Sequence, residues 1–482
     1  MAQAQLSAVL AQGGGDAALG EALASQRRAF LSDGPPSYET RIDRLNRLSA
    51  VIKRNKDAVV KAISEDFGNR SRHETLIAEI MGSLDAVGHA KRHLRDWMKS
   101  KRRPLDRLKF GLARARIHYQ PLGVIGIIAP WNYPFYLAIS PLAPALAAGN
   151  RVMIKPSELT PHLAELLAKM IGEVFKPEEV TVITGGPAIG EAFSQLAFDH
   201  LLYTGSTQVG RKVMLAAADK LVPVTLELGG KSPVIVADDY AIDKAAGSIW
   251  AGKLLNAGQT CIAPDYAFVP SKRRDDFVLA SKQAVSRMYP TLARNPDYTS
   301  IVADRHYERI QRLLTDARAK GAKTVEINPA GEELGNQRKI APTLVLDVND
   351  DMAIMKEEIF GPVMPIKTYD RAEEALDYIN AHPRPLALYV FSDNVATQDK
   401  VLTYTTSGGV TVNDTLFHVA TESLPFGGVG PSGLGAYHGW EGFATFSHAK
   451  ATFYQAKWNM AGMLRPPFGA KIERMLGMLL GK

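Results

Sequence analysis

Two kinds of hydrophobic pattern divide much of the chain into helices and strands. Across residues 41–67 apolar side chains recur every three or four positions, which predicts helix, and helix is predicted again for residues 74–99. Residues 124–129 are instead an uninterrupted apolar run, which is typical of a parallel strand buried on both faces. Residues 110–119 alternate between polar and apolar and predict a strand or one side of a hairpin.

After residue 150, strand and helix patterns alternate along the chain. Strands are predicted at 151–154, 180–184, 200–203 and 222–228, with helices at 162–174, 189–195 and 208–217 between them. A second series runs from Gly230 to about Val412, with helices at 242–255, 273–288, 304–320 and 372–380. This alternation predicts parallel sheets covered by helices on both faces, with ligands at the carboxyl ends of the strands. The fold class is therefore α/β, with two α/β domains that meet at a cleft.

The two ends of the chain carry weaker patterns. Residues 1–25 are rich in Ala, Gln and Gly and are predicted to be frayed or weakly helical. Residues 456–482 form a basic amphipathic tail, in which Lys471, Arg474 and Lys482 lie among apolar residues. Two interpretations of this tail stay open, contact with a membrane surface and packing on the protein's own dimer. Packing is favoured, because the final helix is short and the tail has no cysteine for lipidation.

Composition excludes several classes of protein. Of 482 residues, 46% are hydrophobic and 22% are charged, and neither a secretory signal nor a run of about 18 uncharged apolar residues is present. The net charge of +7 comes largely from residues 91–116, but no recognition module accompanies them, so nucleic acid is not an expected partner. His89 and His93 lie one helical turn apart without a third ligand, so no metal site is expected. The lone cysteine fits a reducing cytoplasm, because it can form no disulfide within the chain.

That cysteine, Cys261, lies in the polar stretch Gly-Gln-Thr-Cys-Ile-Ala-Pro at 258–264. An inert thiol used as core filler is the alternative interpretation, but the Leu and Val neighbours of such a cysteine are missing. Three other stretches favour chemistry: Pro-Trp-Asn-Tyr-Pro at 130–134, Glu-Leu-Gly-Gly-Lys at 227–231 and Glu-Glu-Ile-Phe-Gly-Pro at 357–362. Together they supply a nucleophile, an amide donor, a carboxylate base and a second carboxylate, which are the parts needed to oxidise an aldehyde.

These motifs, in this order, resemble the aldehyde dehydrogenase superfamily over about residues 41–450. The sequences at 258–266, 423–430 and 437–439 are similar to its dimeric class-3 branch, and the segment 26–36 resembles the bacterial coniferyl aldehyde dehydrogenases. The resemblance implies a small β arm that bridges two subunits, and an exposed arm strand itself needs an edge to pair with, so a homodimer is expected. The implied division is a Rossmann-type NAD-binding domain at 1–99 and 124–229, a catalytic domain at 230–412, an oligomerisation arm at 100–123 and 413–455, and the tail at 456–482.

A cofactor site is expected where the turn from Gly205 to Gly210 follows a predicted strand and begins a helix. Backbone N–H groups at such a turn can hold a pyrophosphate, although by spacing alone an ordinary glycine turn is equally consistent. The resemblance assigns Gly205, Ser206 and Gly210 to the cofactor and implies that Lys155 and Glu158 hold the adenosine ribose. The Glu158 carboxylate would repel a 2′-phosphate, so NAD is the expected cofactor, with NADP also accepted in the class-3 branch.

Further cofactor residues follow from the same resemblance. Glu358 is expected to fix the nicotinamide ribose, and Phe360 to flank the nicotinamide ring. Trp131 is placed beside the cofactor and, with Tyr133, is expected to line the passage near Asn132.

Catalysis is expected to begin at Cys261. A thiol with a pKa of about 8.5 is only about 3% thiolate at pH 7, so it needs help from a helix N-terminus, a nearby base or the positive charge of the cofactor. Asn132 and the backbone N–H of Cys261 are the expected oxyanion donors. Glu227 is the expected general base that activates water, which implies release of a free acid rather than transfer to coenzyme A.

The substrate is expected to be an apolar aldehyde. Tyr133, Trp250, Leu254 and Phe417 are the candidate walls of its site, and the resemblance favours a phenylpropenal such as coniferyl aldehyde, with fatty or other aromatic aldehydes next. A cysteine acyltransferase or thioesterase is opposed by the predicted nucleotide turn. A non-catalytic binding protein is opposed by the joint presence of Asn132, Glu227, Cys261 and Glu358.

Overall fold

The computed structural model describes residues 15–459 and 461–481. Its first sheet has six strands in the order β15-β7-β6-β3-β4-β5, all parallel except for β15, which pairs antiparallel with β7. The strands are β3 (Val124–Ile128), β4 (Arg151–Lys155), β5 (Val180–Val182), β6 (His200–Thr204), β7 (Val224–Glu227) and β15 (Gly433–Leu434). The predicted strands at 124–129, 151–154, 180–184, 200–203 and 222–228 are therefore confirmed, within a few residues at their ends.

Helices cover both faces of this sheet. Alternate strand residues such as Ile125 and Ile127 pack against α3, α5, α7 and α8, whereas Val124 and Met153 pack against α2, α9 and α10. These helices are α2 (Gly15–Asp33), α3 (Tyr38–Phe67), α5 (Gly82–Trp97), α7 (Tyr136–Ala148), α8 (Pro161–Val174), α9 (Pro187–Ser194) and α10 (Thr207–Ala218). The doubly wound arrangement predicted from the alternating pattern is confirmed.

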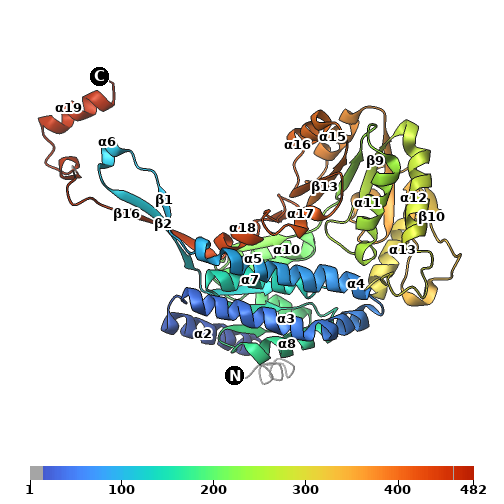
Figure 1. Cartoon of the computed structure of the whole chain (residues 1–482), viewed down its shortest axis with the longest axis horizontal. Coiled ribbons are helices and arrows are strands. Elements are labelled where there is room, and N and C mark those ends of the chain that lie inside the picture. The colour runs from blue at the N-terminus through green and yellow to red at the C-terminus, as the bar shows by residue number, and fades with distance from the viewer. Residues whose placement is uncertain (1–14, 460, 482) are drawn as a thin grey trace.

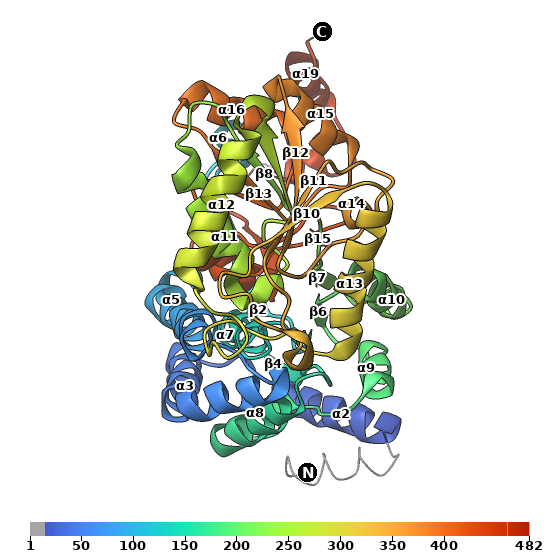
Figure 2. The same cartoon turned by 90° about the vertical axis from the view of Figure 1, so that its right-hand side faces the viewer.

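The second sheet has seven strands in the order β10-β11-β12-β9-β8-β13-β14, and only β10 runs antiparallel to its neighbour. Its strands are β8 (Pro233–Val236), β9 (Tyr266–Pro270), β10 (Lys323–Glu326), β11 (Thr343–Leu346), β12 (Val363–Tyr369), β13 (Ala387–Phe391) and β14 (Gly409–Val412). Its helices are α11 (Ile242–Leu254), α12 (Arg274–Met288), α13 (Asp304–Ala319), α14 (Ala353–Lys356), α15 (Ala372–Ala381) and α16 (Val395–Tyr404). Figure 2 shows this sheet above the first one, with the strands of the two sheets directed toward a common central region.

A third sheet forms an arm. β1 (Lys101–Arg103), β2 (Arg114–Pro121) and β16 (Ser447–Tyr454) pair antiparallel in the order β1-β2-β16. Figure 1 shows this arm projecting away from the two larger sheets, with the short α6 (Arg107–Phe110) at its tip and α19 (Ala470–Leu479) beyond it.

The segment expected to belong entirely to the arm, 413–455, is in fact divided. β15 joins the first sheet beside β7, and α18 (Gly439–Thr445) packs against α5 and α7. α17 (Phe417–Ala420) contacts β14 of the second sheet, and only β16 lies in the arm. The expected boundary is corrected for this reason: residues 417–445 contribute elements to the body of the protein.

Two further expectations need correction. Of the two states expected for residues 1–25, residues 15–25 are helical and not frayed: they belong to α2, whose Leu19 and Leu23 are buried against the first sheet and whose Gln26 Nε2 donates to the carbonyl of Val152 at 3.1 Å. Residues 1–14 of the same prediction lie outside the described residues. Phe110 ends a helical turn rather than beginning a strand, so the alternating pattern is realised only from Arg114 onward.

The remaining predicted helices agree with the structure, with one irregularity. The predicted helix at 74–99 is built from α4 (Arg72–Glu74), a π-helical segment (Thr75–Met81) and α5. Short 3₁₀ segments occupy Leu255–Gly258, Ser271–Arg273, Gly335–Gln337 and Ala461–Leu464. Among the described residues, none of the helices is long and apolar enough to cross a membrane, and no cluster of three or more metal-ligating side chains occurs.

Candidate active site

Cys261 follows a tight loop at the end of α11. Asn256, Ala257 and Gly258 all have positive φ angles, of 54°, 52° and 78°. At Gly258 only glycine fits, because a Cβ atom would lie 2.3 Å from the carbonyl oxygen of Gly361. The side chain of Gln259 holds the loop by donating to the carbonyls of Asn256 (3.0 Å) and Ser300 (3.1 Å) and by accepting from the backbone N–H of Val302 (2.9 Å). The polar neighbours of Cys261 thus fix its backbone.

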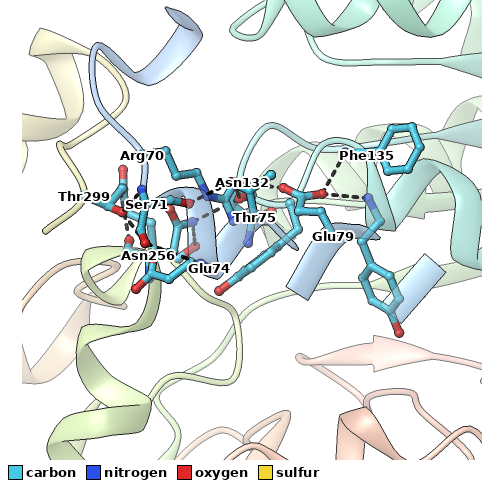
Figure 3. A network of polar contacts seen from close by, with 12 residues as sticks. Arg70, Ser71, Glu74, Thr75, Glu79, Asn132, Phe135, Asn256 and Thr299 are labelled. Atoms are coloured by element: carbon cyan, nitrogen blue, oxygen red, sulfur yellow. Dashed lines mark hydrogen bonds and ion pairs between the residues drawn. The ribbon is translucent and has the colours of Figure 1, made fainter. Parts of the chain in front are cut away.

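A buried polar network joins this loop to Asn132 (Figure 3). The backbone carbonyl of Asn132 accepts from Arg70 Nη1 at 2.9 Å and from Asn256 Nδ2 at 3.0 Å. Arg70 forms an ion pair with Glu79 at 2.8 Å, and both of these side chains are fully buried. Glu79 also accepts from the backbone N–H of Tyr136 at 2.7 Å, at the start of α7. The network fixes Asn132 through its backbone and leaves its side-chain amide without a hydrogen bond to any described residue.

Two cavities meet at Cys261. One, of about 380 Å³, is lined mainly by apolar side chains, and the other, of about 200 Å³, lies on the side of Glu358. Cys261, Glu227 and Thr204 line both. A group bound in one cavity can therefore react with a group bound in the other across these three residues.

Glu227 ends β7 and lies opposite Thr204 of the neighbouring strand β6. The Glu227 side chain is buried, at 2% exposure, and neither of its carboxylate oxygens has a hydrogen-bond partner. Burial therefore raises the pKa of Glu227 well above its ordinary value. The Thr204 hydroxyl is likewise buried and unpaired. A buried carboxyl group without a partner is costly for stability, which favours a functional role at this position.

Comparison with known proteins agrees with the motifs and this geometry. The model of the aldehyde dehydrogenase family matches residues 8–452. This chain belongs to the aldehyde dehydrogenase family. It is 53% identical to a probable coniferyl aldehyde dehydrogenase of Caulobacter vibrioides, over 95% of this chain and 96% of that protein. It is 48% identical to a coniferyl aldehyde dehydrogenase of Pseudomonas sp., over 96% of both.

Solved structures agree on the fold of this aldehyde dehydrogenase. The substrate-bound state of Staphylococcus aureus AldH matches it with a TM-score of 0.90 and 38% identity, over 95% of this chain and 99% of that one. A Mycobacterium tuberculosis aldehyde dehydrogenase complexed with NAD+ matches with a TM-score of 0.81 and 28% identity, over 92% and 91%. The predicted family and fold class are thus confirmed.

The thiol of this aldehyde dehydrogenase is not activated by the chain itself. Burial, followed by the negative charges of Glu358 and Glu227, raises the pKa of Cys261 to about 12. Of the three sources of help expected from the sequence, the nearby carboxylates act in the wrong direction, because a negative charge disfavours a thiolate. The backbone N–H groups of Cys261 and Ile262 lower this pKa but are outweighed, and a positive charge brought to the site would lower it further.

Five of the expected cofactor residues line the smaller cavity together: Trp131, Gly205, Ser206, Glu358 and Phe360. The rings of Trp131 and Phe360 meet edge to face with centroids 5.4 Å apart. Burial, together with the negative charge of Asp265, raises the pKa of Glu358 to about 8. Ser206 caps the N-terminus of α10, with its side chain accepting from the backbone N–H of Val209.

Three other expected cofactor residues lie outside this lining. Gly210 lies in the first turns of α10, where a Cβ atom would meet the side chain of Leu228 at 2.5 Å, so it allows close packing of helix on strand. Lys155 ends β4, and its Nζ donates to the carbonyl of Pro156 at 2.7 Å. Glu158 is exposed, but it lies close enough to Tyr203 to contribute, after burial, to the raised pKa of that tyrosine, about 12.

Lys231 is structural in this protein. Its ammonium pairs with Asp265 and donates to the carbonyls of Ile354 (2.8 Å) and Glu357 (3.0 Å). Asp265 in turn accepts from the backbone N–H of Ile359 at 2.9 Å. These contacts hold the segment that carries Glu358 against Asp265, which lies between Cys261 and β9.

Of the four expected substrate residues, two line the larger cavity and two do not. Tyr133 and Phe417 line the larger cavity, and the Tyr133 hydroxyl lies 2.7 Å from that of Thr260. Trp250 and Leu254 do not line it, because this face of α11 is packed into the core, where both side chains are buried. The neighbouring positions Ala251, Gly252 and Leu255 line the cavity instead.

Several site residues were missed by sequence reasoning. Arg70, Glu79 and Asn256 hold Asn132 and the Cys261 loop, and Thr204 lies between the two cavities. The only signal in the sequence was two charged residues, Arg70 between the predicted helices at 41–67 and 74–99 and Glu79 within the second of them. That signal does not distinguish a buried ion pair from a solvated face.

Proposed function

We propose that this protein oxidises an apolar aromatic or phenylpropenal aldehyde, such as coniferyl aldehyde, to its carboxylic acid with NAD or NADP as hydride acceptor. The observation that carries the proposal is that Cys261 and Glu227 face both an apolar cavity and a second cavity with the expected nucleotide residues. The names of the two coniferyl aldehyde dehydrogenase relatives support the choice of substrate.

The residues present fit a nicotinamide cofactor. Glu358 offers a half-buried carboxylate to a ribose, and the start of α10 at Ser206 offers backbone N–H groups to phosphate. Lys155 and Glu158 would hold the second ribose. A neighbouring solved structure contains NAD+, and a rat relative 40% identical to this chain is named as NADP-preferring. Bound NAD(P)+ supplies the hydride acceptor and a positive charge beside the thiol.

The chain's own groups then divide the reaction into two stages. In the first, the Cys261 sulfur attacks the aldehyde carbon and forms a thiohemiacetal, whose oxygen carries negative charge. Asn132 can donate its free side-chain amide to that oxygen, together with the backbone N–H of Cys261. Losing one such donor costs roughly 3–4 kcal/mol in comparable enzymes.

In the second stage, the thioester that remains on Cys261 is hydrolysed. Glu227 is the carboxylate that shares both cavities with Cys261, and its two oxygens are unpaired and free to accept a proton from water. Because burial raises the pKa of Glu227, its ionised form needs a higher pH than that of a solvated glutamate. Hydrolysis is therefore expected to become faster as pH rises.

A fatty aldehyde is the second candidate substrate, because Ile77, Met81, Leu137 and Leu416 are among the cavity's lining residues. A non-catalytic role is opposed by the unpaired, buried Glu227.

We also propose the domain division given above for residues 1–412, a homodimer formed through β1, β2 and β16, and a cytoplasmic location suited to a free thiol. The tail stays a candidate for packing at the dimer rather than at a membrane.

The test follows NAD(P)H formation by absorbance with coniferyl aldehyde, benzaldehyde and a long-chain alkanal. Turnover that is fastest with coniferyl aldehyde and is lost in Cys261→Ala is expected. Turnover of the alkanal alone would keep the mechanism and change the substrate class. The absence of reaction with every aldehyde and both cofactors would refute the proposed function.

A further inference from the structure

The charged lining of the larger cavity is entirely acidic. Its carboxylates are Asp85, Glu227, Asp414 and Glu422, and no Lys, Arg or His is among the described residues that line it. Glu227 is assigned to the reaction, and Asp414 already accepts from the backbone N–H of Thr415 at 2.8 Å. Asp85 and Glu422 have neither role.

These two carboxylates lie near each other at the solvent end of the cavity. Asp85 is exposed and follows the exposed Ile77 and Met81 along one helical region, whereas Glu227 at the inner end is almost fully buried. Burial raises the pKa of Glu422 to about 7, with the charge of Asp85 as the second cause. The backbone N–H of Gly439 favours its charged form. Neither carboxylate accepts a hydrogen bond from another described side chain, so both remain available to a ligand.

The wall between the two ends is aromatic. Tyr133, Tyr136, Phe417 and Phe426 all line the cavity. Burial raises the pKa of the Tyr136 hydroxyl, and the charges of Glu422, Asp85 and Cys261 raise it further, so this side chain interacts with both the acidic pair and Cys261. An aromatic ring held by these side chains would direct its aldehyde toward Cys261 and the opposite edge of the ring toward the acidic pair.

We propose that Glu422, assisted by Asp85, accepts a hydrogen bond from a phenolic hydroxyl at the far end of the substrate. The cavity itself is a ligand site on independent grounds, since the unpaired and buried Glu227 is directed into it. The acidic lining also disfavours aldehydes that end in a carboxylate, because like charges would meet in a partly desolvated space. The inference rests on the proposed function and narrows it to neutral 4-hydroxyaryl aldehydes.

The experiment compares three substrates of nearly identical shape: 4-hydroxy-3-methoxycinnamaldehyde, its O-methyl ether 3,4-dimethoxycinnamaldehyde, and unsubstituted cinnamaldehyde. Their kcat/KM values are measured for the wild type, Glu422→Gln, Glu422→Met and Asp85→Asn. Glu326→Gln, which removes an exposed carboxylate on β10, is the matched control for charge.

A hydrogen bond to a charged acceptor predicts that the wild type prefers the phenol over its methyl ether by roughly 10-fold or more. In Glu422→Met the ratio is expected to fall to about 1, mainly through a higher KM for the phenol. Glu422→Gln keeps an acceptor oxygen and should give an intermediate ratio. This variant still tests the inference if Glu422→Met does not fold. Glu326→Gln should keep the wild-type ratio.

A result against this inference can be distinguished from a result against the proposed function. A wild-type ratio near 1, or a ratio that survives both Glu422→Met and Asp85→Asn, overturns this inference and leaves the aldehyde dehydrogenase reaction in place. Failure of all three aldehydes to reduce either cofactor would instead refute the proposed function itself.

Discussion

Replacement of Glu227 by Gln should separate the two stages of the reaction. Gln has nearly the same shape, and no described residue hydrogen-bonds to the Glu227 carboxyl, so the substitution breaks no hydrogen bond. Folding stability should therefore change by less than about 1 kcal/mol. A missing general base should slow hydrolysis by roughly 10²–10⁴-fold, which corresponds to about 3–5 kcal/mol in the barrier.

The assay is rapid mixing of Glu227→Gln with an aldehyde and NAD, followed by intact-mass measurement. We expect a burst of one reduced cofactor per subunit, a much slower steady state, and one acyl group on Cys261. Cys261→Ala should show neither burst nor adduct. Wild-type turnover in Glu227→Gln would refute the role of this carboxylate, and a slow variant without burst or adduct would move its role to the attack step.

Three further results are expected. With a pKa of about 12, only roughly 1 in 10⁵ Cys261 thiols is ionised at pH 7, so iodoacetamide should alkylate the apoenzyme slowly and NAD+ should accelerate it; equal rates would contradict the electrostatic argument. Glu158→Gln should raise the kcat/KM ratio of NADP to NAD about fivefold, and an unchanged ratio would remove Glu158 from the ribose site. Arg70→Met leaves Glu79 buried without its partner and should lower the free energy of unfolding by about 3–5 kcal/mol in a denaturant titration. The control is Arg72→Met, at an exposed ion pair, which should lower the free energy of unfolding by less than about 1 kcal/mol. Equal losses in the two variants would show that the buried pair stabilises the protein no more than the exposed one.

The strands of the first sheet could be predicted because their signal is local. A strand such as β3, covered by helices on both faces, must be apolar at every position, and residues 124–129 show this directly. The short motifs around Cys261, Glu227 and Glu358 do come together at one cavity, because each motif follows a strand or loop that leads to the same region. These were the features that sequence could supply.

Other features depend on contacts between distant segments. Helical spacing identifies α11 but does not say which side of it faces the substrate cavity, so Trp250 and Leu254 were assigned to the wrong environment. β15 is two residues long and carries no periodic signal; its place beside β7 follows from long-range packing. The ion pair of Arg70 and Glu79 cannot be predicted for the same reason, since charged residues are most often solvated.

The separation of the two cavities has a consequence for how this enzyme can diversify. Glu227, Cys261 and Thr204, which the cavities share, lie on strand ends and one tight loop, whereas much of the wall of the larger cavity comes from residues 77–85, from α11 and from 414–426. Natural variation or a mutant library confined to 77–85 and 414–422 could therefore change which aldehyde is accepted without touching the nucleotide side. In evolutionary terms, the residues that react and the residues that select the aldehyde lie in different segments, so the selecting segments can change in sequence while the reacting residues stay the same.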